Sequence, residues 1–314
     1  MAFDLEHIPS QAGKTAIVTG ANTGLGYETV INLAKKNCKV IMACRHPDRA
    51  EHAKADIEAK VPGANLEILL IDLSDLSSVR AFAQAFRQQY DRLDLLINNA
   101  GIMWPPYALT VDGFESQMGT NYLGHFLLTM LLLDLMPDTP ESRVVSLSSN
   151  AHKLGSGAIN FDDLHSEQNY SKTGAYAQSK LACLMFGNEL QRWLANAGKQ
   201  IRSITAHPGV SNTELARHMP QYQIDLIQYT IGPLLCHPPA QAAMPIVMAA
   251  LDPEAQGGEY FGPQGFLEMK GQPGRATQSD YAQNQAAAEH LWDVSEQLTE
   301  STFALPQTQA VTTP

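Results

Sequence analysis

The chain has 314 residues, of which 44% are hydrophobic, and a formal net charge of −11 at pH 7. This composition supplies a full core, and the acidic charge argues against nucleic acid or an anionic membrane surface as a partner. The apolar run at 126–136 is shorter than the ~18 residues of a membrane span, and residues 1–6 lack the pattern of a secretory signal, so we expect a cytoplasmic protein without a membrane anchor.

Short apolar, β-branched runs alternate with helical stretches along most of the chain. This alternation predicts an α/β fold, a doubly wound parallel sheet whose ligands bind at the carboxyl ends of the strands. The expected strands are 14–19, 38–44, 66–71, 93–97, 143–147, 200–206 and 258–261. The expected helices are a stretch ending at 36, then 46–61, 77–90 with Ser74 or Ser77 as its cap, 112–135, 170–197, 239–251 and 280–299.

We find no internal repeat and no linker, which predicts one domain over residues 1–300. The alternation lapses after Pro208, and the Met-, Tyr- and Leu-rich stretch at about 210–240 predicts a small substrate lid, although a packed pair of helices fits equally well. Residues 301–314 are rich in Thr, Gln and Pro and are expected to be disordered. The cysteines lack C-x-x-C spacing and the histidines lack ligand spacing, so we expect reduced thiols and no metal site.

The first strand runs directly into a glycine-rich turn, Gly20-Ala21-Asn22-Thr23-Gly24-Leu25-Gly26, which opens a helix. A strand, a glycine turn and a helix N-terminus in this order direct main-chain N–H groups at a phosphate. The glycines follow T-G-x-x-x-G-x-G and depart from the stricter G-x-G-x-x-G pattern, and a tight turn without a ligand is the alternative. We interpret the turn as the phosphate loop of a nicotinamide dinucleotide site.

The end of the second strand carries a cation where folds that bind NAD carry an acid. Ala43 and Cys44 are followed by Arg45 and His46. A guanidinium suits a 2′-phosphate, which a carboxylate would repel. The residues therefore favour NADP(H) over NAD(H), with an ordinary solvated loop charge as the alternative.

Tyr176 and Lys180 stand one helical turn apart in a stretch that predicts a helix, so they share a face. A lysine ammonium at roughly 4 Å would contribute about 4 kcal/mol in a cleft of effective dielectric ~20, on the order of 3 pK units. This reasoning predicts a tyrosine with a lowered pKa that acts as a general acid. The alternative is a surface lysine that passes a packed tyrosine.

Several motifs in one order resemble the classical short-chain dehydrogenase/reductase family over roughly residues 12–262. They are Thr19-Gly20-x-x-x-Gly24-x-Gly26, Asp72, Asn98-Asn99-Ala100-Gly101, Asn121, Ser149, Tyr176-x-x-x-Lys180 and Pro208-Gly209. The resemblance implies a Rossmann fold in which Tyr176 protonates a carbonyl oxygen that Ser149, the second of two serines, also binds. It further implies that Lys180 binds the nicotinamide ribose and lowers the pKa of Tyr176, and that Asn121 holds a water of the proton relay.

Three phrases resemble the subgroup of retinol dehydrogenases, the WW-domain oxidoreductase and protochlorophyllide reductase. They are Ile41-Met42-Ala43-Cys44-Arg45, Asn121-Tyr122-Leu123-Gly124-His125-Phe126 and Ser148-Ser149-Asn150-Ala151-His152. No cysteine lies between Ser149 and Tyr176, where the light-dependent enzyme has one, which argues against protochlorophyllide as substrate.

Together these features predict an NADP(H)-dependent oxidoreductase that interconverts a carbonyl and an alcohol on a small, fairly apolar substrate. A cofactor-binding regulator without turnover, and a relative that reduces a C=C bond or epimerises, are the alternatives. The expected cofactor contacts are Gly20, Asn22, Thr23, Gly24, Leu25, Gly26, Arg45, Asp72, Leu73, Asn99, Ala100, Gly101, Tyr176, Lys180, Pro208, Gly209, Val210 and Thr213. The expected pocket walls are Met103, Trp104, His152, Leu154, Met219 and Tyr222. The family resemblance also implies a homodimer or tetramer formed through helices 112–135 and 170–197.

Overall fold

The structure, a computed structural model, describes residues 3–210 and 237–302. The predicted lid at 210–240 and the predicted tail at 301–314 lie almost wholly outside these residues. Among the described residues, no helix combines the length and the apolar character that a membrane span requires.

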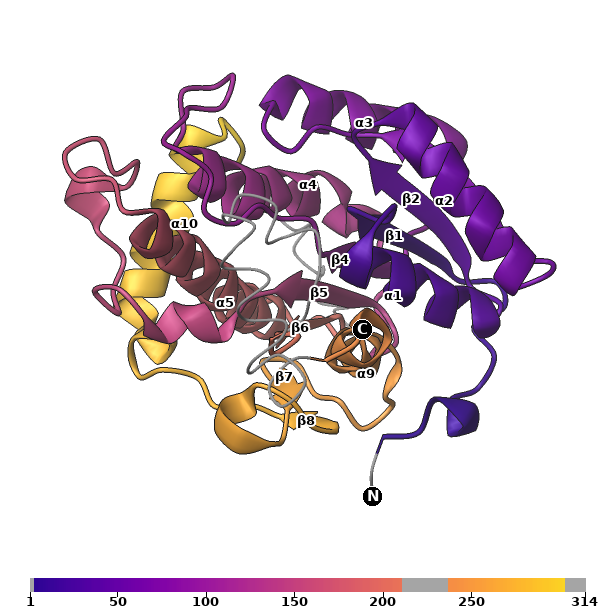
Figure 1. The fold of residues 1–314 in the computed structure, drawn as a ribbon. Helices are drawn as coiled ribbons and strands as arrows, with labels where there is room; N and C mark the ends of the chain where they lie inside the picture. Colours follow the sequence, from indigo (N-terminus) through magenta and orange to yellow (C-terminus); the bar gives the residue numbers. More distant parts are fainter. Residues whose placement is uncertain (1–2, 211–236, 303–314) are drawn as a thin grey trace, which may run out of the picture.

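One sheet organises the molecule, with strand order β3-β2-β1-β4-β5-β6-β7-β8 (Figure 1). The strands are β1 (Thr15–Thr19), β2 (Lys39–Cys44), β3 (Leu66–Leu70), β4 (Leu95–Asn98), β5 (Arg143–Leu147), β6 (Arg202–Ala206), β7 (Tyr260–Pro263) and β8 (Pro273–Arg275). Neighbours from β3 to β7 pair in parallel, which confirms the doubly wound α/β fold. The antiparallel edge strand β8 was not predicted, because three residues that begin with a proline carry no strand signal.

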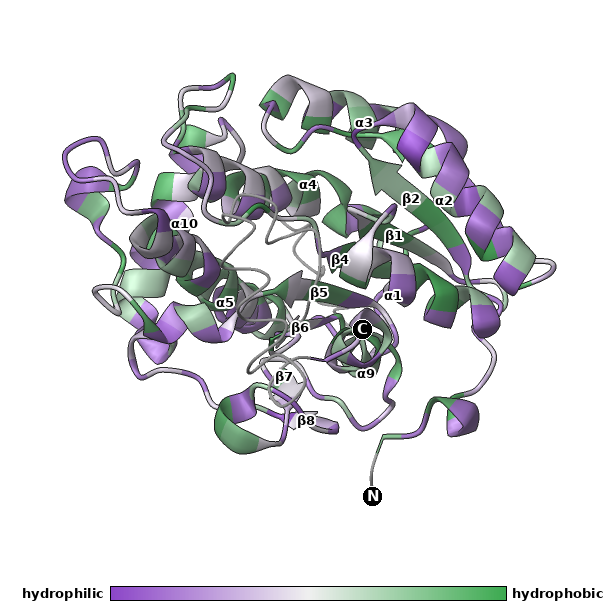
Figure 2. Ribbon diagram, viewed as in Figure 1, coloured by the Kyte–Doolittle hydropathy of each residue, from purple (hydrophilic) through white to green (hydrophobic). Residues whose placement is uncertain are grey.

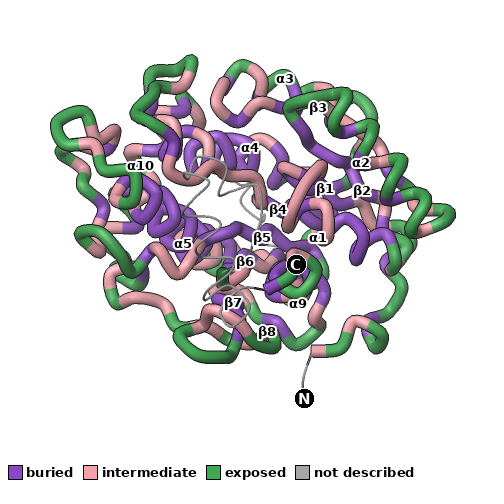
Figure 3. The backbone as a smooth tube through the Cα atoms, viewed as in Figure 1, coloured by how far each residue is buried: buried purple, intermediate pink, exposed green. Residues whose placement is uncertain are grey.

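Helices cover both faces of the sheet. The helices are α1 (Gly24–Lys35), α2 (Pro47–Lys60), α3 (Leu76–Gln89), α4 (Gly124–Leu132), α5 (Lys172–Asn196), α8 (Pro239–Ala242), α9 (Met244–Leu251) and α10 (Gln285–Leu298). Successive strand residues point to opposite faces, so Ile17 joins the core under α3, α4, α5 and α10, while Val18 joins the core under α1, α2 and α9. The central strands β1, β2, β4, β5 and β6 are accordingly mostly hydrophobic and buried, whereas the edge strands β3 and β8 are partly exposed (Figures 2 and 3).

The C-terminal helix α10 packs across α4 and α5 with an aromatic contact. The Trp292 ring lies 5.2 Å from that of Phe126 and 5.9 Å from those of Phe186 and Trp193. The chain therefore covers with its own residues part of the two helices through which the family resemblance implies oligomerisation. The oligomeric state stays a prediction.

Three predicted elements differ from the structure for local reasons. The helix expected at 112–135 starts later than predicted, because the chain turns at Gly113, where φ is +84°. It then includes a π-helix, Met118–Leu123, before α4. The helix expected at 239–251 breaks at Ala243, two residues before Pro245, which has no N–H for the helical ladder. Asp75, not either of the predicted serines, caps α3 by accepting from the N–H groups of Ser77 and Ser78.

Candidate active site

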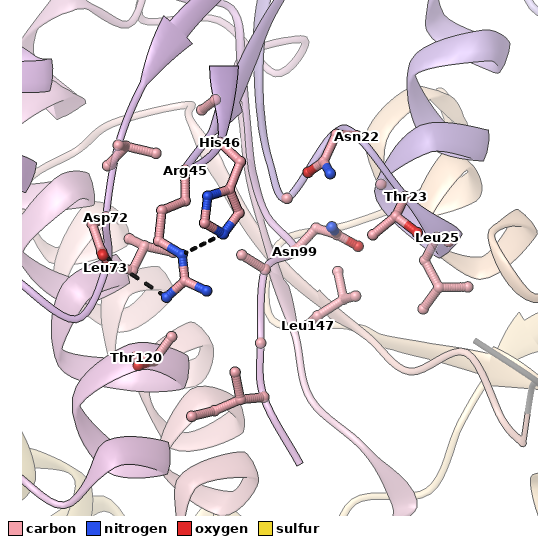
Figure 4. Close-up of a pocket in the computed structure, with 18 of the residues that line it drawn as sticks. Asn22, Thr23, Leu25, Arg45, His46, Asp72, Leu73, Asn99, Thr120 and Leu147 are labelled. Atoms are coloured by element: carbon pink, nitrogen blue, oxygen red, sulfur yellow. Dashed lines mark hydrogen bonds and ion pairs between the residues drawn. The ribbon is translucent and has the colours of Figure 1, made fainter. Parts of the chain in front are cut away.

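A cleft of about 690 Å³ opens at the carboxyl ends of the central strands (Figure 4). The order of the strands reverses between β1 and β4, which is where open α/β sheets bind ligands. The predicted residues that line the cleft are Gly20, Asn22, Thr23, Gly24, Leu25, Gly26, Arg45, Asp72, Leu73, Asn99, Ala100, Gly101, Tyr176, Lys180 and Pro208.

The glycine turn forms one wall of the cleft. Gly20 and Gly24 have φ of +64° and +54°, a region that side chains disfavour, and a Cβ on Gly26 would lie 2.3 Å from the Gly20 carbonyl oxygen. Thr23 precedes the first turn of α1 without a side-chain capping bond. The first N–H groups of α1 therefore have no side-chain acceptor among the described residues of the cleft wall. A bound phosphate would accept hydrogen bonds from such groups.

Asn99 supplies a polar atom that a ligand would satisfy. Its Nδ2 donates to the Thr19 carbonyl oxygen at 2.7 Å. Its Oδ1 is buried and finds no hydrogen-bond partner among the described residues. An orphaned acceptor beside a glycine cradle fits a dinucleotide with ribose hydroxyls to donate.

Basic side chains lie at the end of the cleft beyond β2, where the close-up shows Arg45 and His46 (Figure 4). Arg45 lies 3.8 Å from the Asp72 carboxylate, and its Nε donates to His46 at 3.3 Å. His46 and Arg49 also line the cleft, although neither was named as a cofactor contact from the sequence. The sequence carries a signal for Arg49: a cation in the first turn of a helix is unfavourable with the helix dipole, which suggests that it binds an anion.

Tyr176 and Lys180 project from α5 at the opposite end of the cleft, and both side chains are buried. The Lys180 Nζ donates to the Leu147 carbonyl oxygen at 3.0 Å and lies 5.9 Å from the centroid of the Tyr176 ring. Burial raises the pKa of Tyr176 to about 12, against the lowering effect of a hydrogen bond with Ser149. The predicted lowering of this pKa is therefore wrong for the protein alone, because the cost of burying a phenolate outweighs nearby polar groups.

The structure separates the roles of the two adjacent serines. Ser148 donates its hydroxyl to the Lys180 carbonyl oxygen at 2.7 Å, which ties α5 to the end of β5. The Ser149 hydroxyl is the one that interacts with the Tyr176 phenol. Ser149 also accepts from the Ala151 N–H at 3.1 Å, which fixes the hydroxyl oxygen at the start of a short helical turn.

Asn121 lies next to this end of the cleft, inside the π-helix. Its Oδ1 accepts from the Ile102 N–H at 2.8 Å, and its Nδ2 donates to the Ile102 carbonyl oxygen and the Ser179 hydroxyl, each at 3.0 Å. The side chain therefore joins the strand β4 exit to α5 beside Lys180.

Other predicted residues lie elsewhere. His152, predicted as a pocket wall, is fully buried, with its ring nitrogens bonded to Ser149 and Ser279. Leu154 lines a separate cavity of about 260 Å³. Met103, Trp104, Gly209 and Val210 do not line the main cleft, although Gly209 directly follows Pro208, which does. Thr213, Met219 and Tyr222 lie outside the described residues.

The chain is similar to known proteins both in sequence and in structure. Residues 14–223 match the family model described as short chain dehydrogenase. The chain is 40% identical to human retinol dehydrogenase 13 over 92% of its own length and 86% of that protein. It superimposes on a crystal structure of an uncharacterised protein from Mycobacterium paratuberculosis with TM-score 0.80 and 41% identity, covering 97% of this chain and 100% of that one. It also matches the RhlG/NADP active-site complex of Pseudomonas aeruginosa, with TM-score 0.62, 25% identity and coverage of 80% and 94%.

Proposed function

The chain belongs to the short-chain dehydrogenase family, and from that premise we propose that it is an NADP(H)-dependent oxidoreductase interconverting a carbonyl and an alcohol. The relatives named retinol dehydrogenase support an alcohol and carbonyl pair as the substrate class. The apolar side chains of Ile102 and Leu147 in the cleft wall support a fairly apolar substrate.

One observation carries the proposal: a single cleft runs from the glycine turn to the Tyr176 phenol, which interacts with Ser149. A dinucleotide bound along this cleft would supply the hydride, which no protein side chain supplies. The glycine turn would hold its diphosphate, and Asn99 and Lys180 would hold ribose hydroxyls.

Tyr176 has the protonation state that a reduction needs. With its pKa raised to about 12, the phenol is protonated at neutral pH and has a proton to donate to a carbonyl oxygen. Ser149 would orient that oxygen toward the phenol. Lys180, whose pKa is lowered by burial, would contribute its charge at the base of the same cleft.

The two arginines at the other end of the cleft support NADP(H) over NAD(H). Arg45, His46 and Arg49 line one wall, and a guanidinium can bind a phosphate through two parallel hydrogen bonds. Asp72, the nearest carboxylate in the wall, is held by the N–H and hydroxyl of Ser74 and lies beside Arg45. Because Ser74 already binds this carboxylate, the Arg45 guanidinium is the group in this wall that would bind a 2′-phosphate.

A turnover screen with NADPH and NADH across aldehydes, ketones and enones tests the proposal. We expect carbonyl reduction with NADPH, and a loss of about 10²- to 10⁴-fold in kcat for Tyr176→Phe, the range that a general acid contributes. Tyr122→Phe is the matched control, because it removes a buried phenol that bonds to Ser295 outside the cleft. Wild-type rates in Tyr176→Phe would overturn the proposal, and activity on enones alone would favour C=C reduction.

A further inference from the structure

A buried histidine outside the cleft bonds both to the end of β1, which leads into the glycine turn, and to the π-helix that carries Asn121. His125, the second residue of α4, is 4% exposed and does not line the cleft. Its Nε2 lies 2.8 Å from the hydroxyl of Thr19, the last residue of β1. Its Nδ1 lies 2.9 Å from the carbonyl oxygen of Asn121 in the π-helix.

Counting donors and acceptors decides which ring nitrogen carries the proton. The Thr19 hydroxyl oxygen accepts from the N–H groups of Asn99 and Ala100, each at 2.9 Å, which uses both lone pairs. Its proton is then directed to His125 at 2.8 Å, since the Ile97 carbonyl oxygen is farther away at 3.4 Å. His125 Nε2 is thus the acceptor, and Nδ1–H donates to the Asn121 carbonyl oxygen.

The charge state agrees with this assignment. Burial lowers the pKa of His125 to about 4, helped by the charge of Lys180, although the bond to Asn121 opposes the shift. The ring is therefore neutral at neutral pH and has one donor and one acceptor. Each finds a partner, as a buried polar network requires.

The Asn121 carbonyl is the meeting point of two elements of the fold. It accepts from Cys183 of α5 at 3.3 Å as well as from His125. The Asn121 side-chain amide also donates to the Ser179 hydroxyl of α5 at 3.0 Å. A Cβ placed on Gly101 would lie 3.1 Å from Asn121 Oδ1 and 3.5 Å from Lys180 Nζ, so the Gly101 backbone passes close to both groups.

We propose that His125 is a positioning residue: as its Nδ1–H tautomer it links Thr19 to the Asn121 carbonyl and holds the cofactor half of the cleft in register with the Tyr176 and Lys180 half. The inference rests on the proposed function for its kinetic consequences only. A misplacement of about 1 Å by a remote substitution can lower a rate by up to ~10²-fold, so loss of the link should act on turnover.

The tautomer is tested without any activity. In protein labelled with ¹⁵N-histidine, the His125 signals, assigned by their absence in His125→Gln, should show a protonated Nδ1 and an unprotonated Nε2. They should not titrate between about pH 5.5 and 8, given the pKa of about 4. A protonated Nε2, or a titration in this range, would overturn the proposal even if the enzyme turns over.

The link is tested with Thr19→Val, His125→Gln and the double variant. Each single variant should lower kcat by about 10- to 100-fold and leave the KM of the carbonyl substrate nearly unchanged. The double variant should lose no more than the worse single variant, because both break one link. Losses that multiply in the double variant would overturn the inference.

Conservative and control variants separate positioning from folding. Thr19→Ser keeps the hydroxyl and should restore most of the wild-type rate, and His125→Asn keeps a donor near the Nδ1 position and should retain more activity than His125→Gln. Thr29→Val removes a buried hydroxyl that donates, within the part of the chain that the structure describes, to the Leu25 carbonyl oxygen of the same helix, and should have little effect. A rate unchanged by Thr19→Val would overturn the link, whereas a wild-type protein without turnover would overturn the proposed function and leave the tautomer test standing.

Discussion

Replacing Arg45 by alanine should change the cofactor preference far more than the catalytic rate. The Arg45 guanidinium is the charge that the structure places closest to Asp72 at the cleft wall, at 3.8 Å, and its side chain is 49% exposed. A 2′-phosphate bound there would accept hydrogen bonds from the guanidinium and be attracted by its charge. NADH carries a neutral hydroxyl at that position and would lose little.

The magnitude follows from this geometry. Two unit charges about 4 Å apart attract by about 4 kcal/mol at an effective dielectric of ~20, and half exposure to solvent lowers this value. Hydrogen bonds to charged groups are measured at about 1.5–3 kcal/mol. Arg45→Ala should therefore weaken NADPH binding by roughly 10- to 150-fold. The removal also leaves Asp72 unpaired beside the phosphate, which acts in the same direction.

Isothermal titration calorimetry of NADPH and NADH with wild type and Arg45→Ala measures the effect. Arg275→Ala, an exposed arginine paired with Glu259 on the far edge of the sheet, is the matched control. An Arg45→Ala/Arg49→Ala variant should bind NADPH more weakly still. If Arg45→Ala weakens both cofactors by the same factor, the guanidinium does not read the 2′-phosphate and the reasoning fails.

Three further substitutions or conditions test the fold beneath the site. Gly26→Ala should weaken NADPH binding by at least about tenfold, because its Cβ would lie 2.3 Å from the Gly20 carbonyl oxygen. Gly174→Ala, whose Cβ would have its nearest contact at 3.3 Å, should bind NADPH as wild type does. Equal NADPH affinity of Gly26→Ala and wild type by titration would contradict this. Leu291→Ala should lower the free energy of unfolding in urea by about 2–5 kcal/mol, because Leu291 is 1% exposed, while the exposed Asp293→Ala should change it by less than about 0.5 kcal/mol. Burial lowers the pKa of His152 from 6.5 to about 4, so the unfolded chain binds the proton more readily and stability should fall as pH falls from about 6.5 to 4. The pH dependence should be shallower in His152→Phe, and an identical slope would refute that assignment.

Much of the fold and one side of the site could be predicted because parallel sheets bring strand ends to one edge. Residues far apart in sequence, such as Gly20, Arg45 and Asn99, each follow a short apolar strand, so their strand-end positions alone predict that they meet. The shared helix of Tyr176 and Lys180 could be predicted in the same way, because their spacing is one helical turn. These features need only the strand and helix periods.

Features that depend on packing could not be predicted. The pKa of Tyr176 follows the burial of its ring, which spacing does not reveal. His46, the residue before α2, lines the cleft, and the link between Thr19 and His125 joins residues 106 positions apart. The π-helix at Asn121 lies in a sequence that has an ordinary helical pattern.

The helix α10 is synthesised last among the helices that the structure describes, after the segments that it covers. The aromatic surface of Phe126, Phe186 and Trp193 belongs to segments that are synthesised before residues 285–298, which supply Trp292 and Leu291 to cover it. Until α10 has been synthesised and packs, this aromatic surface lacks its cover, and exposed apolar surface of this kind favours aggregation. Removal of α10 by proteolysis would expose Phe126, Phe186 and Trp193 to water again, so an intact C-terminal helix keeps this aromatic surface covered in the finished chain.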